Sequence, residues 1–332
     1  MTVYLHGVGH AHPKNEITNV FLERLDIGTS VEWILERTGI RSRRTVLGLD
    51  YIEKTRNADV RAASEAMVVS GADLVSEAVE MALARSGMTR ADIGLILAGG
   101  TIPEYVTPAE AGWIGGRLGI EAPAVDVRSA CTSVGAALYL LSLMAPDKIP
   151  DLVLVAACET VTRAVDYRDR SAAVLWGDAA VALLVSTRLP SRVRLEQASL
   201  SSSPAGWDKV VIPWASHFTQ QGRTVQAFAI KRTVQMLRAL RASLDHADAA
   251  RFHFIGHQGN ALMLENVCRT CQIPADRHHE NVQDFGNTAT AGSPSVLSQE
   301  WERFRPGDCV ALLGVGAGLT WTGGLLRFGE GA

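Results

Sequence analysis

Short apolar runs alternate with amphipathic stretches along almost the whole chain. Three of the apolar runs are ADIGLILAGG, DLVLVAACE and AAVALLVS, which are typical of strands buried on both faces. Between such runs, residues 71–86 and 261–271 carry apolar side chains at helical spacing, and Gly87 follows the first of these helices as a C-cap. The alternation predicts an α/β fold with mostly buried strands.

The two halves of the chain repeat one order of elements: helix, strand, polar loop, helix, strand. In the second half this order is carried by KRTVQMLRALRASL, RFHFIGHQGN, ALMLENVCRTC, DFGNTATAGSPSVLSQEW and DCVALLGVGAGLTWTGGLLRF. The repetition predicts an internal duplication, with an N-terminal half over residues 1–190 and a C-terminal half over residues 191–332. We expect the seam in the Ser- and Pro-containing stretch 189–203.

Composition narrows the class of protein. Among 332 residues, 47% are hydrophobic and 20% charged, which excludes a disordered chain. The net charge of −3 favours neither nucleic acid nor a polybasic membrane surface. The five cysteines are odd in number and unevenly spaced, which fits a reducing compartment. With no secretory signal at the N-terminus and no apolar run of ~20 residues, we expect a soluble cytoplasmic protein.

Cys131 is the first candidate for chemistry. It lies in VDVRSACTSVGAALYLLSLM, where a strand ends and a helix rich in small residues begins. Helix N-termini leave backbone N–H groups unpaired and carry partial positive charge, which stabilises a thiolate. We therefore expect Cys131 to have a lowered thiol pKa and to act as a nucleophile, although a free cysteine is also common as a small core residue.

Two further side chains sit at comparable junctions. His257 follows an apolar strand in FIGHQGNALML, and Asn287 lies in the turn-rich loop DFGNTATAGSP before a helix. Ligands of α/β proteins bind at such strand ends. Cys131, His257 and Asn287 together supply a nucleophile, a proton-handling or hydrogen-bonding group and a neutral donor.

The glycine-rich run GVGAGLTWTGG at 314–324 resembles a nucleotide loop but cannot serve as one. Too little chain follows it to supply the helix and second strand of a dinucleotide fold, and no GxxxxGK loop occurs. We interpret it as a tight turn whose backbone N–H groups face the active site as oxyanion donors.

The remaining cysteines and histidines do not combine into a metal site. Cys268 and Cys271 lack a second pair at zinc-site spacing, and we expect them to be buried or partly buried on a helix. Three histidines near the first strand, His6, His10 and His12, have no carboxylate or cysteine nearby to complete a metal site. Two more, His278 and His279, are expected to lie in an exposed loop of the second half.

Taken in order, these motifs make the chain similar to the ketoacyl-carrier-protein synthase III family of the thiolase superfamily. The resemblance runs nearly end to end, through SVEWILERTGIRSRR, DVRSACTSVGAAL, WGDAAVALL, GHQGN, FGNTATAGSP and GAGLTWTGGLLRF. It implies a thiolase-like duplicated five-layer α/β/α/β/α fold, a homodimer and no cofactor other than thioester substrates. It also implies that Cys131, His257 and Asn287 are the catalytic residues.

The resemblance implies a two-stage reaction. Cys131 takes an acyl group from coenzyme A or an acyl carrier protein, and His257 and Asn287 bind the carbonyl of a malonyl or β-ketoacyl thioester that condenses with it. Backbone N–H groups of Cys131, Gly316 and Ala317 would stabilise the oxyanions. The positions that match the family's coenzyme A and pantetheine contacts are Trp33, Arg37, Arg170 and Asn260.

Several residues depart from the family's fatty-acid members. Thr107 falls where many short-chain members place a bulky aromatic residue at the bottom of the partner subunit's acyl pocket. Ser171 replaces a glycine, Leu262 replaces a basic residue used in carrier docking, and the charged stretch 49–66 is longer. These departures favour specialised-metabolite (polyketide) or long-chain lipid biosynthesis. We interpret 49–66 as a solvated helical excursion, with docking of a partner as the alternative.

Two other activities stay open at this point. An acyltransferase on the same fold would pass the acyl group from Cys131 to an alcohol or amine. A cysteine hydrolase would share the chain order Cys, His, Asn, although the signatures of those enzymes around the cysteine are missing.

Overall fold

The computed structural model describes residues 2–330, in which strands from both halves join into one ten-stranded sheet, ordered β12-β11-β13-β14-β8-β1-β7-β6-β4-β5. The first half supplies β1 (Val3–Ala11), β4 (Ile93–Ala98), β5 (Ala124–Asp126), β6 (Leu152–Glu159) and β7 (Ala179–Ser186). The second supplies β8 (Val193–Ser202), β11 (Phe252–Ile255), β12 (His278–His279), β13 (Cys309–Gly316) and β14 (Thr320–Phe328). Outside this sheet lie β2 (Asn15–Thr18) with β3 (Ser42–Thr45) and β9 (Val210–Val211) with β10 (Thr219–Gln220).

The strand pairing shows the duplication directly. In the first half β5, β4 and β6 are parallel neighbours, and β7 and β1 follow antiparallel. The second half repeats this with β12, β11 and β13 parallel and β14 and β8 antiparallel. The halves meet where β1 pairs with β8. The predicted division between residues 190 and 191 falls between β7 and β8 and stays a prediction.

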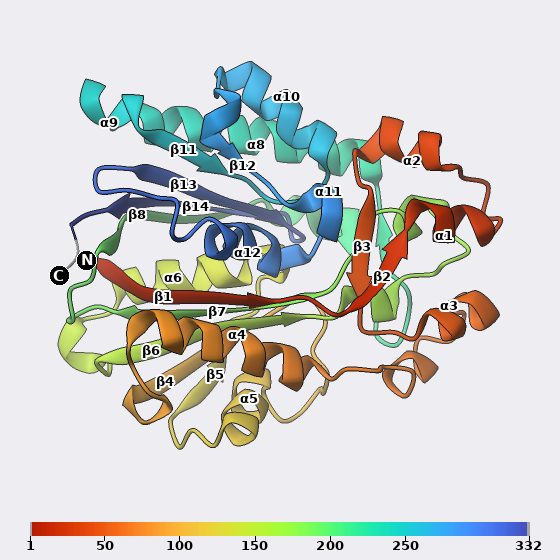
Figure 1. Cartoon of the computed structure of the whole chain (residues 1–332), viewed down its shortest axis with the longest axis horizontal. Coiled ribbons are helices and arrows are strands. Elements are labelled where there is room, and N and C mark those ends of the chain that lie inside the picture. Colours follow the sequence, from red (N-terminus) through yellow and green to blue (C-terminus); the bar gives the residue numbers. More distant parts are fainter. Residues whose placement is uncertain (1, 331–332) are drawn as a thin grey trace.

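Helices form three layers around the two halves of the sheet (Figure 1). The outer helices are α4 (Gly71–Ser86) and α5 (Glu110–Leu118) on the first half, and α8 (Gly222–Ala242) and α10 (Ala261–Cys271) on the second. Between the halves lie α6 (Ser133–Leu143) and α12 (Gly292–Gln299). The short helices are α1 (Asn19–Arg24), α2 (Val31–Thr38), α3 (Leu49–Thr55), α7 (Arg170–Ala173), α9 (His246–Ala250) and α11 (Val282–Phe285). The predicted thiolase-like five-layer fold is confirmed.

The sequences of the two middle helices, α6 and α12, suit their position between the two halves of the molecule. A helix that lies between the two halves of the sheet must be apolar or small on every side, and α6, with the sequence SVGAALYLLSL, contacts strands of both halves. In α12 every residue from Gly292 to Ser298 is buried, and small side chains let the helix approach both halves of the sheet. The helix that follows Cys131 is therefore held inside the molecule.

Glycines on β1 allow α4 to pack against the sheet. A Cβ atom at Gly9 would lie 1.9 Å from the backbone oxygen of Ala78, and one at Gly7 would lie 2.2 Å from that of Ala82. Since neither contact is possible, the helix or the strand would have to move.

We expect Gly9→Ala to lower the free energy of unfolding by about 1–3 kcal/mol, because overpacking a core displaces the backbone. Gly116→Ala is the matched control, since a Cβ at that α5 position would meet no atom within 4 Å and alanine is favoured in helices by about 0.5–1 kcal/mol. Urea unfolding of both variants is the measurement. Equal stability of the two variants would contradict the close packing of α4 on β1.

Three parts of the structure differ from the sequence predictions. Strand β8 occupies most of the predicted seam at 189–203, because Val193 and Leu195 alternate inward within it. Helix α8 begins at Gly222, well before the predicted KRTVQMLRALRASL. The prediction that His278 and His279 lie in an exposed loop is wrong.

Those two histidines form the edge strand β12, which pairs with β11. His279 is 4% exposed, and its ring stacks on His253 at a centroid distance of 5.1 Å. His278 and His279 therefore belong to the packed edge of the second half, where burial lowers the pKa of both imidazoles.

The charged stretch 49–66 is helical at its start, as predicted, and exposes most of its charged side chains. It is also anchored, because Ile52, Asn57 and Ala63 are buried. The Asn57 amide donates to the backbone oxygens of Arg163 and Val165, each at 2.9 Å. The purely solvated interpretation is therefore too simple, and a docking role stays a prediction.

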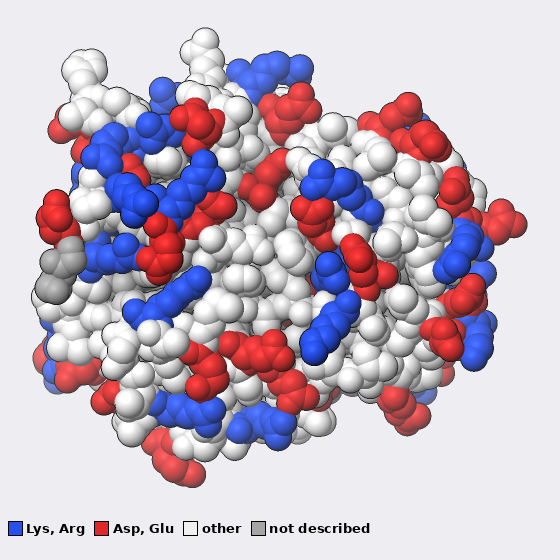
Figure 2. All heavy atoms as spheres, in the orientation of Figure 1, with Lys and Arg blue, Asp and Glu red and all other residues white. Residues whose placement is uncertain are grey.

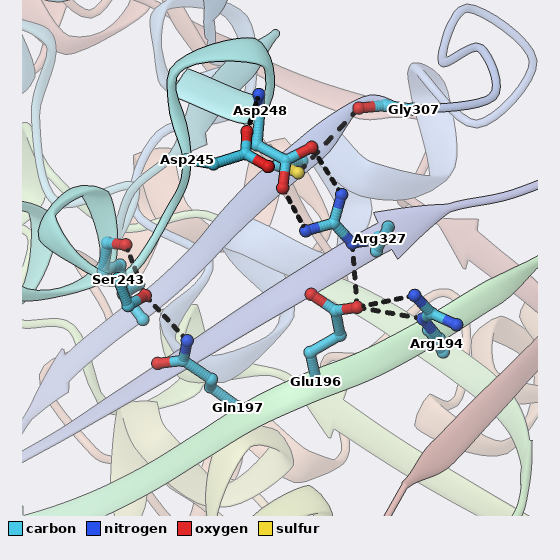
Figure 3. A network of polar contacts seen from close by, with 10 residues as sticks. Arg194, Glu196, Gln197, Ser243, Asp245, Asp248, Gly307 and Arg327 are labelled. Carbon is cyan, nitrogen blue, oxygen red and sulfur yellow. Dashed lines mark hydrogen bonds and ion pairs between the residues drawn. The ribbon is translucent and has the colours of Figure 1, made fainter.

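A charged network ties the end of the second half together (Figure 3). The Arg327 guanidinium on β14 donates to both carboxylate oxygens of Asp248 on α9 and to Glu196 on β8. Bidentate pairs of this kind fix geometry as well as adding energy. Across residues 2–330, none of the helices combines the length and the apolar character needed to cross a membrane.

Candidate active site

The duplication brings the candidate residues to one place. Cys131 lies between β5 and α6, and Asn287 lies in the equivalent connection between β12 and α12. His257 follows β11, the counterpart of β4. Since the carboxyl ends of these parallel strands meet at the centre of the molecule, three residues far apart in sequence become neighbours.

All three side chains line one cavity of about 200 Å³. Two backbone positions predicted as oxyanion donors, Gly316 and Ala317, line it as well. So do Arg37, Asn260 and Trp176, and so does the first part of α8 through Val225, Gln226 and Ala229. Because α8 begins earlier than predicted, it forms one wall of this cavity.

The backbone around Cys131 is tightly shaped. Ala130 has a φ of 46°, in the left-handed region that non-glycine residues rarely adopt, and a 3₁₀ turn over Ala130–Thr132 leads into α6. A Cβ at Gly316 would lie 3.1 Å from the Cys131 backbone nitrogen, so the absence of a side chain there lets the strand backbone reach the cysteine. The backbone N–H groups of Cys131 and Ala317 lie close enough to the sulfur to lower the pKa of the thiol. An oxyanion forming beside the sulfur would meet the same two donors.

The predicted lowering of the Cys131 pKa is wrong. Burial, and secondarily the nearby Glu159 carboxyl group, raise the pKa of this thiol to about 12. The neighbouring Thr101 hydroxyl and the backbone N–H groups of Cys131 and Ala317 act in the opposite direction but are outweighed. A low-dielectric site disfavours the thiolate more than these donors stabilise it, so Cys131 is a thiol at neutral pH.

His257 is buried, and burial lowers the pKa of its imidazole to about 4. The ring is therefore neutral at pH 7, with one N–H that can donate a hydrogen bond. Its Nδ1 has no hydrogen-bond partner among the described residues. A buried, unpaired polar atom at the wall of a cavity is available to a ligand.

The Asn287 amide is oriented by its own loop. Its Oδ1 accepts a hydrogen bond from the backbone N–H of Ala289 at 3.0 Å, so the other end of the amide presents its N–H donors elsewhere. The backbone of Asn287 pairs with the segment around Trp176. The preceding Gly286 has a φ of 68°, and a Cβ there would lie 2.7 Å from the Leu175 oxygen. Only glycine fits at that turn.

The predicted coenzyme A residues form two groups. The guanidinium groups of Arg37 and Arg170 lie 4.8 and 4.7 Å from the centre of the Trp33 ring, so these three side chains form one cation–π cluster. Arg37 extends from this cluster into the wall of the cavity. Asn260 caps α10 through its side-chain oxygen and also lines the cavity.

Thr107 does not line the catalytic cavity of its own chain. It is exposed on the loop between β4 and α5, so its placement against a partner's acyl pocket stays a prediction. Cys268 and Cys271 lie on α10, partly buried and buried, as predicted. Within residues 2–330, no group of three or more His, Cys, Asp or Glu side chains is arranged to hold a metal ion.

Sequence reasoning missed two polar residues beside Cys131. Glu159 ends the buried strand β6, and Thr101 follows β4 and donates to the Glu159 carboxylate. The usable signal was a carboxyl group at the end of an otherwise apolar run, since charged residues are rarely fully buried without a role.

Comparison with known proteins identifies the family of this chain. Residues 125–204 match the family model described as 3-Oxoacyl-[acyl-carrier-protein (ACP)] synthase III, and residues 241–328 match the model of its C-terminal part. A beta-ketoacyl-[acyl-carrier-protein] synthase III of Levilactobacillus brevis is 31% identical over 95% of this chain and 94% of its own length. The chain belongs to the ketoacyl synthase III family.

Other ketoacyl synthase III enzymes extend the comparison over the whole chain. The enzyme of Syntrophomonas wolfei is 31% identical over 99% of this chain and 98% of its own. The crystal structure of the Pseudomonas aeruginosa enzyme superposes with a TM-score of 0.85 at 26% identity, covering 100% of both chains. The protein is thus a condensing enzyme of the ketoacyl synthase III type, which is an acyltransferase.

Proposed function

We propose that Cys131 takes an acyl group from a coenzyme A or carrier-protein thioester, and that this acyl group is then joined to a malonyl or β-ketoacyl thioester. The observation that carries the proposal is the single cavity lined by Cys131, His257 and Asn287. A nucleophile and two neutral hydrogen-bond donors fit a site that holds an acyl group covalently and binds the carbonyl of a second substrate.

In the first stage the Cys131 sulfur attacks the thioester carbonyl. The carbonyl oxygen becomes an oxyanion that accepts hydrogen bonds from the Cys131 and Ala317 N–H groups. The carbon–sulfur bond to the donor then breaks, the donor sulfur takes up the proton that the Cys131 thiol gives up, and the acyl group stays on Cys131.

In the second stage the neutral His257 ring and the Asn287 amide donate to the thioester carbonyl of the extender. A malonyl unit that loses CO₂ leaves its electron pair as an enolate, and these two donors stabilise the enolate oxygen. The enolate carbon attacks the acyl carbonyl on Cys131, and the cysteine sulfur leaves. A neutral imidazole suits this role because it donates without a proton transfer.

The approach to the cavity supports a nucleotide-bearing substrate. An indole and two guanidinium groups suit an adenine ring and phosphates, and Arg37 links Trp33 to the cavity wall. Asn260 would contact the pantetheine arm. Acidic and basic side chains are interspersed over the face in Figure 2. Binding of a carrier protein, or of the second subunit of the proposed homodimer, would therefore depend on local contacts.

We further propose that the acyl substrates are long or bulky, as in specialised-metabolite or long-chain lipid biosynthesis. Thr107 supports this, because a small residue would leave a partner's acyl pocket deep. Leu262, partly exposed on α10, offers no charge to an acidic carrier.

Thr107→Phe should lower kcat/KM for long acyl donors by about tenfold or more, since lost space in an apolar pocket discriminates by about 1–3 kcal/mol. Short donors should be affected little. Steady-state kinetics with acetyl and dodecanoyl donors measure the split, and Thr107→Ser is the control that keeps the volume small. An equal loss for both donors would remove Thr107 from the acyl pocket.

The experiment that tests the function supplies wild-type protein with an acyl-CoA series and malonyl-CoA or malonyl carrier protein. Liquid chromatography with mass spectrometry follows the products. A new β-ketoacyl product supports condensation. Free acid alone would favour the hydrolase, and acyl esters or amides formed from added alcohols or amines would favour transfer to oxygen or nitrogen.

A further inference from the structure

A second cavity has no part in the steps above. It has a volume of about 310 Å³, and pockets for small molecules begin at about 300 Å³. Three arginines, Arg61, Arg128 and Arg163, line this arginine cavity against a single carboxylate, that of Glu104. Its apolar walls come from Ile102, Pro103, Val106, Ile212, Pro213 and Trp214. Apolar walls with an excess of guanidinium groups suit a ligand that carries both an apolar chain and a negative charge.

The arginine cavity lies at the edge of the sheet where the first half places its nucleophile. Strands β4, β5 and β6 are parallel neighbours. The cavity takes Thr101 from the loop after β4, Arg128 from the loop after β5 and Arg163 from the 3₁₀ turn after β6. Arg128 precedes Cys131 by three positions, and its Nη2 donates to the Thr101 carbonyl oxygen at 3.1 Å. Ligands of α/β proteins bind at such carboxyl ends of strands.

Arg163 is a buried cation with only neutral partners. It is 6% exposed. Its guanidinium group donates to the Thr160 hydroxyl at 2.9 Å, the Ser64 hydroxyl at 3.4 Å and the Pro103 carbonyl oxygen at 3.2 Å. Within residues 2–330 no carboxylate pairs with it, although buried charges in proteins are ordinarily paired. These bonds use three of the five N–H donors of an arginine, so donors are left for a ligand.

Two buried carboxyl groups feel the charge of Arg163 without pairing with it. Burial raises the pKa of Glu110 to about 7 and that of Asp178 to about 6, and the Arg163 charge acts on both in the opposite direction. Asp178 accepts its hydrogen bonds from Thr162 and Val46 instead. The guanidinium of Arg163 therefore keeps its charge directed to the cavity that it lines.

The charged stretch 49–66 supplies one wall of the arginine cavity. Val60, Arg61 and Ser64 line it, and the Ser64 hydroxyl accepts one of the bonds from Arg163. Arg61 and Arg128 are both exposed, so their charges lie on the solvent side of the buried Arg163. The stretch therefore helps to build a pocket as well as meeting solvent.

We propose that the arginine cavity binds a carboxylate at the end of an aliphatic chain. Arg163 pairs with the carboxylate, Arg61 and Arg128 add charge on the solvent side, and the apolar walls hold the chain. Guanidinium and carboxylate groups match in a bidentate geometry, which gives the site its selectivity for this head group. Two sources share this chemistry: the far end of a dicarboxylic acyl group carried by Cys131, and a free carboxylic acid.

Isothermal titration calorimetry with octanoate and octanamide tests the site without any thioester, because the two probes share a chain and differ in the charge of the head group. Octanoate should bind the wild-type protein about tenfold or more tightly than octanamide, since hydrogen bonds between charged groups are the strong ones. Arg163→Gln should bring the two affinities together, and Arg128→Gln should narrow the difference. Arg238→Gln, at an exposed position on α8, is the matched control and should leave the difference intact.

Three results would overturn the proposal. They are no binding of octanoate, equal affinities of the wild-type protein for both probes, and a charge preference that survives both Arg163→Gln and Arg128→Gln. The third would place the probe in another cavity. Should Arg163→Gln fail to fold by circular dichroism, the double variant of the exposed arginines, Arg61→Gln with Arg128→Gln, decides alone.

The rate of Cys131 acylation, followed by intact-protein mass spectrometry, distinguishes the two sources, and only this arm rests on the proposed function. A dicarboxylic acyl group predicts faster acylation by coenzyme A monothioesters of hexanedioic to dodecanedioic acids than by the matching monocarboxylic thioesters, with the preference lost in Arg163→Gln. A free carboxylic acid predicts no such preference while octanoate still binds. A protein that binds octanoate through Arg163 but is acylated by no thioester would overturn the proposed function and support the site.

Discussion

Replacing Cys131 by alanine is expected to abolish C–C bond formation, with a fall in kcat on the order of 10⁴-fold or more, because this sulfur is the nucleophile of the first stage and the leaving group of the second. The cavity places the thiol beside the Ala317 N–H, with Gly316 packed directly against the Cys131 backbone. Of the cysteines in the described part of the chain, residues 2–330, no other lines that cavity. The rate of β-ketoacyl product formation from acyl and malonyl thioesters measures the loss.

Cys268→Ala is the matched control. Cys268 is a free cysteine on α10, outside the catalytic cavity, and its removal should leave the rate within twofold of wild type. If Cys131→Ala retained a tenth of the wild-type rate, the acyl group would have to be held elsewhere, and the two-stage reaction would be wrong.

The second large effect concerns the donors opposite Cys131. His257→Ala and Asn287→Ala should each lower the condensation rate by about 10²–10³-fold, as the loss of an oxyanion donor does. Acylation of Cys131 should stay within a fewfold of wild type, because its oxyanion donors are backbone groups. Single-turnover acylation and steady-state condensation, measured on the same preparations, separate the two steps.

The pH dependence of condensation gives a further test of the role of His257. Its pKa of about 4 means that the imidazole is neutral well above that value. Condensation should therefore lose no activity to protonation of His257 between pH 6 and pH 8, and should lose it only as the pH falls toward 4. His246→Ala, at an exposed position on α9, is the control. Loss of acylation together with condensation in His257→Ala would place His257 in the first stage instead.

Much of the fold and the site could be predicted from the sequence. The helix over 261–271 was predicted with its observed bounds, because it is amphipathic and Asn260 caps it. Cys131, His257 and Asn287 could be singled out because each stands where an apolar run gives way to a loop and a helix. That pattern reflects the duplicated topology, which places Cys131 and Asn287 in equivalent connections.

The electrostatics could not be predicted in the same way. A helix N-terminus after Cys131 suggested a thiolate, but the pKa of this thiol depends on its burial between the two halves of the sheet and on Glu159, which is 28 positions away in the chain. The same limit applies to His278 and His279, whose polar sequence concealed a packed edge strand. Burial of polar side chains is set by tertiary contacts, which periodicity does not encode.

The start of α8 shows a third kind of limit. Its first turns, GRTVQAFAI, lack a clear apolar stripe, because Val225 and Gln226 line the catalytic cavity and only the end of this segment, from Phe228, packs on the core. Residues that line a cavity are chosen for their contacts with the ligand, so the spacing of apolar residues among them departs from the helical period.

The most direct measurement is intact-protein mass spectrometry with a chase. Wild-type protein is exposed to an acyl-CoA, the adduct is mapped by tandem mass spectrometry, and a malonyl thioester is then added. The account predicts one acyl group on Cys131 that disappears on the chase as an equal amount of β-ketoacyl product forms. An adduct on another residue, or one that leaves only as free acid in the presence of the malonyl thioester, would contradict it.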